Sequence, residues 1–379
     1  MRIGILGGGQ LAMMMVESTK KKYDIEFLVV DPTQNPPASK FTKCLQSEYD
    51  NTKTLDIIAK ECDLVTIDFE NVPANALRYL ENKIKVFPNP DALEICQDRL
   101  KEKNLFKELN IPTTNFKSIS SKEDLESYLK NYNQQYILKS RKFGYDGKNQ
   151  IRGVSQSLDK IWNEIKETPY IIENLVDFSN EASLIGVRTQ DKKLFFYPLT
   201  WNNHRNGILR ESMSFNNEIN ETKYQELQKN AENILTKIME KFNYIGVLVI
   251  EFFVDKDFNL IANEMAPRVH NSGHWTIEGA NISQFESHIR SISDINMEKI
   301  KINGFAFMIN LIGNIDRYKP GIMLLGKNTY FHDYGKSERK NRKLGHVTVI
   351  DNSSNKTLEK IKKYHNEFVK PRLYENELI

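Results

Sequence analysis

The chain has 379 residues and a formal net charge of +3, from 53 basic and 50 acidic side chains. At about 150 residues per domain this length predicts two or three domains, and an apolar content of 40% can fill more than one core. The nearly balanced charge gives no electrostatic argument for a nucleic-acid-binding protein or for a basic membrane-docking surface. We therefore expect a soluble multidomain enzyme with no nucleic-acid or membrane partner.

The cysteines and the apolar segments indicate a cellular compartment. Cys44, Cys62 and Cys96 form no Cys-x-x-Cys pair, which excludes a disulfide scaffold and a thiolate zinc site and favours a reducing cytoplasm. The N-terminus enters a strand and a glycine turn directly, so we expect no signal peptide. The longest apolar stretch, Tyr244 to Val254, is interrupted by Glu251 and is too short to cross a bilayer.

Strands and helices alternate over the first ninety residues, a rhythm that predicts a parallel sheet. Pro88 and Pro90 close this unit, because proline continues neither a helix nor a central strand. The predicted elements are strands over 2–6, 26–30 and 63–69 and helices over 10–22, 52–60 and, after the prolines, 91–109.

The pattern then changes to short strands joined by polar and glycine-bearing loops. A polar helix over 223–241 leads into a pair of strands, and the chain ends in another polar helix. A loop rich in Lys and Arg lies between Tyr334 and Asp351. The predicted strands cover 136–139, 170–173, 181–187, 195–198, 244–254, 260–265, 305–311 and 346–350.

A glycine turn follows the first strand. Gly7 to Ala12 fits the pattern G-x-G-x-x-G/A, and Asp31 stands at the end of the next strand. Glycines let the backbone approach an anion closely, and a helix N-terminus attracts phosphate. This leaves two interpretations open, a dinucleotide-binding dehydrogenase and a tight turn in any α/β sheet.

Two glutamates lie on neighbouring predicted strands. The midpoint between Glu251 and Glu264 falls between Asp257 and Phe258, inside the turn residues, so the two carboxylates should face each other on an antiparallel hairpin. Facing carboxylates repel unless a cation lies between them, and Mg²⁺ bound to carboxylates and nucleotide phosphates is usual in ATP enzymes. The alternative is that one glutamate pairs with Arg268 and the other is exposed.

Basic residues suggest anion-binding positions. Lys139 ends an apolar strand, and a glycine-hinged loop over 143–148 follows it. Arg268 can bind a carboxylate or bicarbonate, and His270 can carry a proton. A dense basic group is either a solvated loop or a site for a phosphomonoester; its members are Lys336, Arg339, Lys340, Arg342 and Lys343.

These segments resemble one family, N5-carboxyaminoimidazole ribonucleotide synthetase, an ATP-grasp ligase of purine biosynthesis. The resemblance spans positions 7 to 346, and its most specific part is the block from Asn263 to Trp275. The other segments that carry it are 7–11, 69–73, 144–148, 334–336 and 342–346.

The resemblance implies a mixed α/β and α+β ATP-grasp architecture. Its parts are an N-terminal Rossmann-like parallel-sheet domain over 1–92, an ATP-grasp region over 93–295 with a lid over about 113–176, and a short C-terminal module over 296–379.

The resemblance also implies roles for individual residues. Glu251 and Glu264 match the magnesium ligands, and Lys139, Arg268 and His270 match catalytic positions around ATP and bicarbonate. Glu173 and Val176 match the adenine hinge, and Glu181 the ribose contact. The ATP site would comprise Arg99, Lys139, Gly144, Tyr145, Asp146, Gly147, Lys148, Asn149, Gln150, Glu173, Asn174, Leu175, Val176, Glu181, His204, Asn263 and Glu264. The ribonucleotide would contact Gly8, Gln10, Leu11, Glu70, Tyr145, Asp146, Lys336, Arg339 and Arg342.

The implied reaction joins bicarbonate to 5-aminoimidazole ribonucleotide, with ATP as co-substrate and Mg²⁺, through carboxyphosphate, and yields N5-carboxyaminoimidazole ribonucleotide, ADP and phosphate. The family also implies a homodimer whose product passes to the mutase that follows. Three alternatives to this reaction are a different ATP-grasp ligase, such as formate-dependent glycinamide ribonucleotide transformylase, an NAD-dependent oxidoreductase, and a non-catalytic nucleotide-binding relative. The chain departs from the family pattern at Ala12, Asp68, Asn149 and Trp201.

Overall fold

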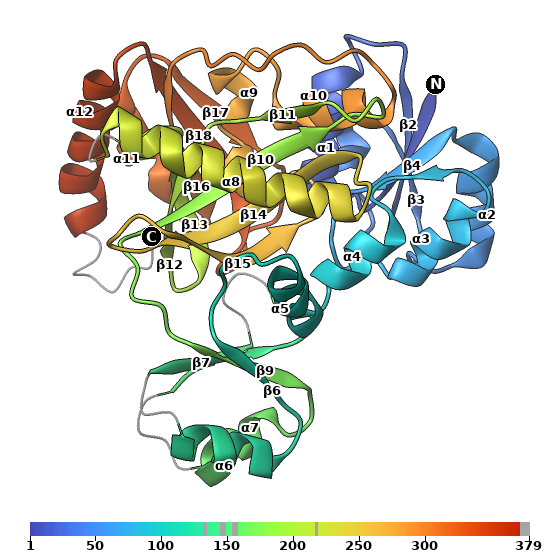
Figure 1. Ribbon diagram of the computed structural model, residues 1–379. Coiled ribbons are helices and arrows are strands. Elements are labelled where there is room, and N and C mark those ends of the chain that lie inside the picture. Colours follow the sequence, from blue (N-terminus) through green and yellow to red (C-terminus); the bar gives the residue numbers. More distant parts are fainter. Residues whose placement is uncertain (132–134, 145–148, 154–157, 217–218, 372–379) are drawn as a thin grey trace.

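A five-stranded parallel sheet forms the N-terminal part of the computed structural model, in the order β3-β2-β1-β4-β5 (Figure 1). Its central strands are mostly apolar and buried, as is usual for a parallel sheet, and the buried polar residue Thr66 in β4 bonds to His288. The structure describes residues 1–131, 135–144, 149–153, 158–216 and 219–371. The elements of this part are β1 (Arg2–Leu6), α1 (Gln10–Thr19), β2 (Glu26–Asp31), β3 (Lys43–Gln46), α2 (Thr52–Glu61), β4 (Leu64–Ile67), α3 (Ala74–Glu81) and β5 (Lys85–Val86).

A four-stranded antiparallel sheet, in the order β6-β9-β7-β8, forms a lid that stands out from the body at the lower end of Figure 1. Two helices pack on it through a small core of its own that includes Leu125 and Ile161. The elements are β6 (Phe116–Ile119), α6 (Lys122–Asn131), β7 (Tyr136–Ser140), β8 (Gln150–Arg152), α7 (Leu158–Ile165) and β9 (Tyr170–Asn174).

A nine-stranded sheet forms the body, in the order β15-β14-β10-β12-β13-β16-β18-β17, with β11 paired to β10. Its pairings are antiparallel. The strands are β10 (Asn180–Arg188), β11 (Leu194–Phe196), β12 (Thr200–Arg205), β13 (Ile208–Met213), β14 (Gly246–Val254), β15 (Leu260–Ala266), β16 (Phe305–Ile312), β17 (Thr329–Asp333) and β18 (Lys343–Asp351).

Alternation along β14 shows how this sheet is buried on both sides. Val247 and Val249 join a core with α10 (Gln284–Ile292) and with α1 of the N-terminal part. Leu248 and Ile250 join the opposite core, with α8 (Glu221–Lys241), which crosses the front of the sheet in Figure 1. Because side chains alternate, Glu251 lies on the Val249 side, which faces the N-terminal part.

The C-terminal residues continue the same sheet. β16 pairs with β13, and β18 pairs with β16. Two helices, α11 (Lys319–Leu325) and α12 (Ser354–Tyr364), cover these strands over a separate apolar core. The one-turn helix α9 (Thr276–Gly279) lies near them.

The predicted parallel sheet is confirmed, but three predicted boundaries are wrong. The helix predicted over 91–109 is two helices, α4 (Pro90–Cys96) and α5 (Arg99–Glu108), because Asp98 leaves helical geometry and caps α5 through the Leu100 N–H. The helix predicted over 10–22 ends at Thr19. The basic loop is shorter than predicted, because β18 begins at Lys343.

In the described ranges, no helix is long and apolar enough to cross a membrane.

Candidate active site

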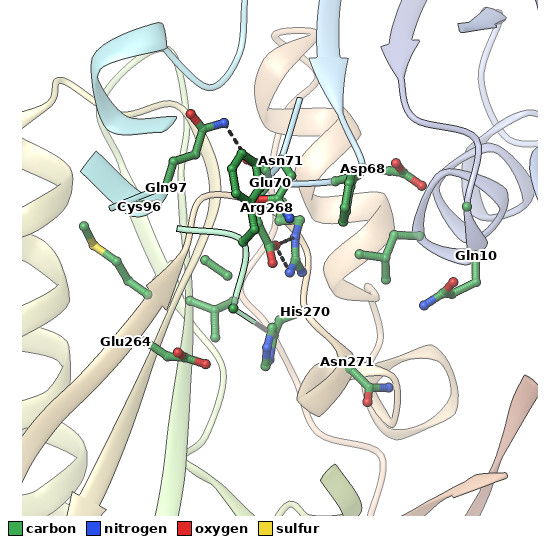
Figure 2. A pocket seen from close by; sticks show the side chains of 18 of the residues that line it. Gln10, Asp68, Glu70, Asn71, Cys96, Gln97, Glu264, Arg268, His270 and Asn271 are labelled. Atoms are coloured by element: carbon green, nitrogen blue, oxygen red, sulfur yellow. Dashed lines mark hydrogen bonds and ion pairs between the residues drawn. The ribbon is translucent and has the colours of Figure 1, made fainter. Parts of the chain in front are cut away.

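A cavity of about 460 Å³ lies where the N-terminal sheet, α5, the β14–β15 hairpin and the basic loop meet. Figure 2 shows Glu70, Arg268, His270 and Glu264 around one space, with Gln10 to one side. Residues predicted from distant parts of the chain line it together, namely Gln10, Leu11, Glu70, Arg99, Gly144, Glu251, Glu264, Arg268, His270, Lys336, Arg339 and Arg342. The cavity therefore joins the predicted substrate, bicarbonate and metal positions.

The two glutamates face each other, as predicted. Glu251 on β14 is the direct antiparallel partner of Glu264 on β15. A register shift follows, because Phe252 pairs with Ala262, so Asn263 is an extra residue on β15. This bulge bends the strand next to the glutamates, as bulges near active sites commonly do.

The two glutamates have different surroundings, which move their pKa values in opposite directions. Arg99 donates to Glu264 at 2.7 Å. Burial would raise the pKa of Glu264, but Arg99 outweighs it and the pKa is lowered. Burial raises the pKa of Glu251 to about 7, and the charge of Glu264 adds to that shift. The alternative in which Arg268 pairs with one of these glutamates is wrong, since Arg268 pairs with Glu70.

His270 is a neutral imidazole that faces Glu251. Its Nε2 lies 3.4 Å from Glu251 Oε1, and its Nδ1 lies 2.9 Å from the Ser272 hydroxyl. Burial lowers its pKa well below the ordinary value, and Arg268 and Lys343 add to the shift. Because Nδ1 accepts from the Ser272 N–H at 3.3 Å, the neutral ring carries its proton on Nε2, where it can donate toward Glu251.

The glycine turn is already filled by the protein's own carboxylates. The Gly8 N–H donates to Asp31 at 2.7 Å, and the Ala12 N–H donates to Asp68 at 3.3 Å. A Cβ at Gly7 would lie 1.7 Å from Asp68 Oδ1. Because a carboxylate occupies the helix N-terminus, a dinucleotide pyrophosphate has no place there, which argues against the oxidoreductase interpretation.

The basic loop reaches the glycine turn across the cavity. Lys336 hydrogen-bonds Gln10, and burial, with Arg342 next, lowers the pKa of Lys336 to about 8. Lys343 lines the same cavity, although we did not predict it as a site residue. Its position in the basic run is the only sequence signal for it.

Lys139 and Glu173 lie together at the joint between lid and body. Lys139 Nζ lies 3.1 Å from Glu173 Oε1 and 3.4 Å from Asn263 Oδ1. Lys103 and Thr114 also contact Glu173, at 3.4 and 2.8 Å. These residues do not line the 460 Å³ cavity, which they adjoin through Asn263 and Glu264.

Other predicted ATP residues surround this joint. Glu181 and His204 contact each other at 3.0 Å; burial opposes the charged imidazole, but Glu181 and Glu251 raise the pKa of His204. Trp201, which departs from the family pattern, packs into the core with α8. The pairing of β12 with β13 shifts by a bulge between Asn203 and His204, so Trp201 and His204 lie on opposite sides of the bulge. Of the predicted hinge residues, Glu173 lies in β9 and Val176 in the connection to β10; the predicted ATP residues between them are Asn174, which ends β9, and Leu175.

The glycine loop is described only at its two ends. Arg99 donates to the Gly144 carbonyl at 3.3 Å. Asn149 has a φ of 56°, in the left-handed region that asparagine tolerates, and Gln150 pairs with Lys139 on the neighbouring strand. The predicted residues Tyr145, Asp146, Gly147 and Lys148 lie outside the described residues.

The facing carboxylates of Glu251 and Glu264 fit a magnesium ion whose remaining ligands come from a nucleotide. Within the described ranges, no three or more His, Cys, Asp or Glu side chains cluster as a complete protein metal site. Two facing carboxylates are what Mg²⁺ usually takes from a protein when phosphates and water complete its shell.

We did not predict two buried charged residues of α5. Glu102 accepts from the Met265 N–H at 2.7 Å, and Lys103 donates to the Ala262 carbonyl at 3.2 Å. They share one helix face with Arg99, and that spacing was the available signal.

Fold and site together define an ATP-grasp ligase. The ATP-grasp domain family matches residues 104–285, the ribonucleotide synthetase preATP-grasp domain matches 1–97, and the phosphoribosylaminoimidazole carboxylase C-terminal domain matches 306–360. The chain belongs to the N5-carboxyaminoimidazole ribonucleotide synthase family. The predicted resemblance is thereby confirmed.

Individual relatives cover nearly the whole chain. The N5-carboxyaminoimidazole ribonucleotide synthase of Pseudomonas aeruginosa is 37% identical over 92% of this chain and 94% of its own. The synthetase structure from Thermus thermophilus is 36% identical, with a TM-score of 0.87, and covers 96% of this chain and 98% of its own. The Aspergillus clavatus synthase, solved with ADP and 5-aminoimidazole ribonucleotide, is 25% identical with a TM-score of 0.85 over 97% and 98%.

Proposed function

We propose that this chain catalyses the ATP-dependent N5-carboxylation of 5-aminoimidazole ribonucleotide in purine biosynthesis, with bicarbonate as the carboxyl donor. The observation that carries this proposal is the single cavity that joins the glutamate hairpin, the Arg268–His270 segment and the basic loop. Membership of the synthase family supports the same reaction. A dehydrogenase is not supported, because Asp68 fills the glycine turn.

The first step is phosphoryl transfer to bicarbonate. A bicarbonate oxygen attacks the γ-phosphorus of ATP, the bond to ADP breaks, and carboxyphosphate forms. Arg268 offers the guanidinium that orients bicarbonate, and Lys139, beside Asn263, offers a cation to the nucleotide. Mg²⁺, held by Glu251 and Glu264, would neutralise charge on the phosphate oxygens.

The second step is carboxyl transfer to the ribonucleotide amine. The amine nitrogen attacks the carboxyl carbon, the bond from that carbon to the phosphate oxygen breaks, and the departing phosphate takes the proton that the amine loses. His270 Nδ1 accepts from the Ser272 N–H, so the neutral ring holds its Nε2 proton toward Glu251 and orients that carboxylate beside the reacting groups. A closed site protects carboxyphosphate from water.

The substrate phosphate is assigned to the basic loop. Lys336, Arg339 and Arg342 line the cavity on the side of the glycine turn, where Lys336 contacts Gln10. Three cations suit a phosphomonoester dianion. Leu11 and Glu70 line the same cavity and complete the proposed ribonucleotide side, whereas the predicted residue Gly8 does not line it and donates its N–H to Asp31.

Other expectations stay predictions. They are the homodimer, the transfer of product to the mutase that follows, the cytoplasmic location, and the individual roles at the ATP site, including the adenine role of Glu173.

Steady-state assays of ADP release test the function. We expect release only when ATP, bicarbonate and 5-aminoimidazole ribonucleotide are all present, with N5-carboxyaminoimidazole ribonucleotide as product. ADP release with formate and glycinamide ribonucleotide would instead support the transformylase, and a change in NADH absorbance the oxidoreductase.

A further inference from the structure

Lys103 is buried where the lid joins the body. It lies on α5, and its side chain is 1% exposed. Its ammonium donates to the Thr113 hydroxyl at 2.9 Å and to the Ala262 carbonyl at 3.2 Å. A buried ammonium is costly unless its donors are satisfied and its charge is balanced, so these contacts need a reason.

The contacts of Lys103 come from both sides of the joint. Thr113 belongs to the segment that enters the lid, and its hydroxyl donates to the Ala262 carbonyl at 2.7 Å. The Ala262 N–H donates to the Pro112 carbonyl at 2.8 Å. Ala262 precedes the bulge residue Asn263 and then Glu264. The ammonium therefore fixes the lid entry against the strand that carries a proposed metal ligand.

Lys103 also shares one carboxylate with Lys139. Glu173 Oε2 lies 3.4 Å from Lys103, and Glu173 Oε1 lies 3.1 Å from Lys139. The three side chains are at most 8% exposed, so their charges are weakly screened by solvent. One carboxylate cannot neutralise two ammonium groups. Burial lowers the pKa of Lys103, and the charge of Glu173 opposes that shift. While both ammonium groups are charged, the triad has a net positive charge, which favours an anion beside Lys139.

We propose that Lys103 is a positioning residue for the nucleotide: it anchors the lid joint to the metal-bearing hairpin and shares Glu173, which leaves the ammonium of Lys139 available to a nucleotide anion. Without Lys103, Glu173 would pair with Lys139 alone and neutralise it. The inference rests on the proposed function only in placing a nucleotide beside Lys139.

The test is ADP binding to the whole protein by calorimetry, without bicarbonate or ribonucleotide. Lys103→Met keeps the length of the side chain and removes the charge, and we expect it to weaken ADP binding about tenfold or more. Lys107→Met is the matched control, because Lys107 is exposed on the same helix and contacts only the Phe116 ring among the contacts that the structure describes for it. We expect ADP binding by the control to be unchanged.

Kinetic constants separate positioning from a general loss of structure. Lys103→Met should raise KM for ATP about tenfold and leave KM for 5-aminoimidazole ribonucleotide and kcat within about threefold. Lys103→Gln keeps a hydrogen-bond donor without the charge and serves if the methionine variant does not fold. Wild-type ADP affinity in either folded variant would overturn the proposal. A protein that binds ADP but lacks bicarbonate-dependent ATP cleavage would overturn the proposed function and leave the Lys103 test intact.

Discussion

Glu70 and Arg268 form an ion pair across the seam between the N-terminal part and the β14–β15 hairpin, although they lie 198 residues apart in the chain. Both side chains are largely buried, at 24% and 13% exposure. The carboxylate therefore holds the guanidinium at one place on the wall of the cavity (Figure 2). Two nitrogens of the guanidinium, Nε and Nη2, contact the same Glu70 oxygen, Oε2, so Glu70 sets where Arg268 can meet a second anion.

Glu70→Gln should raise KM for bicarbonate or for 5-aminoimidazole ribonucleotide about tenfold, because Arg268 loses the charge that orients it. ADP binding should be unchanged. Steady-state kinetics with each substrate varied in turn measure this. Glu61→Gln is the control. Glu61 ends α2 and forms an exposed pair, at 3.2 Å, with Arg2 at the start of β1. Equal kinetics for Glu70→Gln and wild type would contradict the prediction.

Glu264→Gln should abolish bicarbonate-dependent ATP cleavage, by at least about a hundredfold in kcat, because it removes one of two facing carboxylates proposed to hold Mg²⁺. The fold should remain intact by circular dichroism. Asp257→Asn, an exposed change in the turn of the same hairpin, should keep wild-type turnover. Near wild-type turnover in Glu264→Gln would refute the metal assignment.

Binding of 5-aminoimidazole ribonucleotide should weaken as pH rises through about 8. Burial lowers the pKa of Lys336 to about 8, so its ammonium is charged below that pH and lost above it. Kd measured by calorimetry between about pH 7 and 9.5 tests this. The phosphate loses its second proton at about pH 6, so its charge stays constant over that range. Lys336→Arg stays charged over this range, so its Kd should not rise at that pH.

The lowered pKa of Lys336 also predicts the direction in which the free energy of unfolding changes with pH. The unfolded chain keeps a lysine near its usual pKa of about 10.4, so between about 8 and 10 the unfolded state binds the extra proton. The contribution of Lys336 to the free energy of unfolding therefore rises with pH across that window, because the cost of burying its charge disappears. Binding and stability thus respond in opposite directions.

Gly7→Ala should destabilise the protein by about 3 kcal/mol or more, since the new Cβ would strike Asp68 at 1.7 Å and φ is +106°. Gly326→Ala separates the two causes, because its φ is +67° and no atom lies within 4 Å of the added Cβ. With ψ at −143° this backbone strongly favours glycine, and we expect the change to cost about 1–3 kcal/mol from the backbone alone. Urea unfolding measures both; equal losses would mean that contact with Asp68 is unimportant.

Much of the local structure could be predicted because it follows from neighbouring residues. Apolar runs indicated β1, β2 and β4, and the midpoint between Glu251 and Glu264 indicated their pairing. The pairs nearer the turn are centred on Asp257, half a residue from the predicted midpoint, and the extra residue Asn263 then brings Glu264 opposite Glu251. Sequence could not locate the break inside 91–109, since a single capping side chain, Asp98, interrupts an otherwise helical pattern.

By itself the sequence determined the parallel sheet, the glutamate hairpin and the set of chemical groups available to the site, because strand periodicity and turn position are local properties. Only the tertiary structure decided which charges meet. It assigned Arg268 to Glu70, filled the glycine turn with Asp68, and placed Glu173 between Lys103 and Lys139. Electrostatic pairing depends on distance in space and on burial, and neither leaves a periodic signal along the chain.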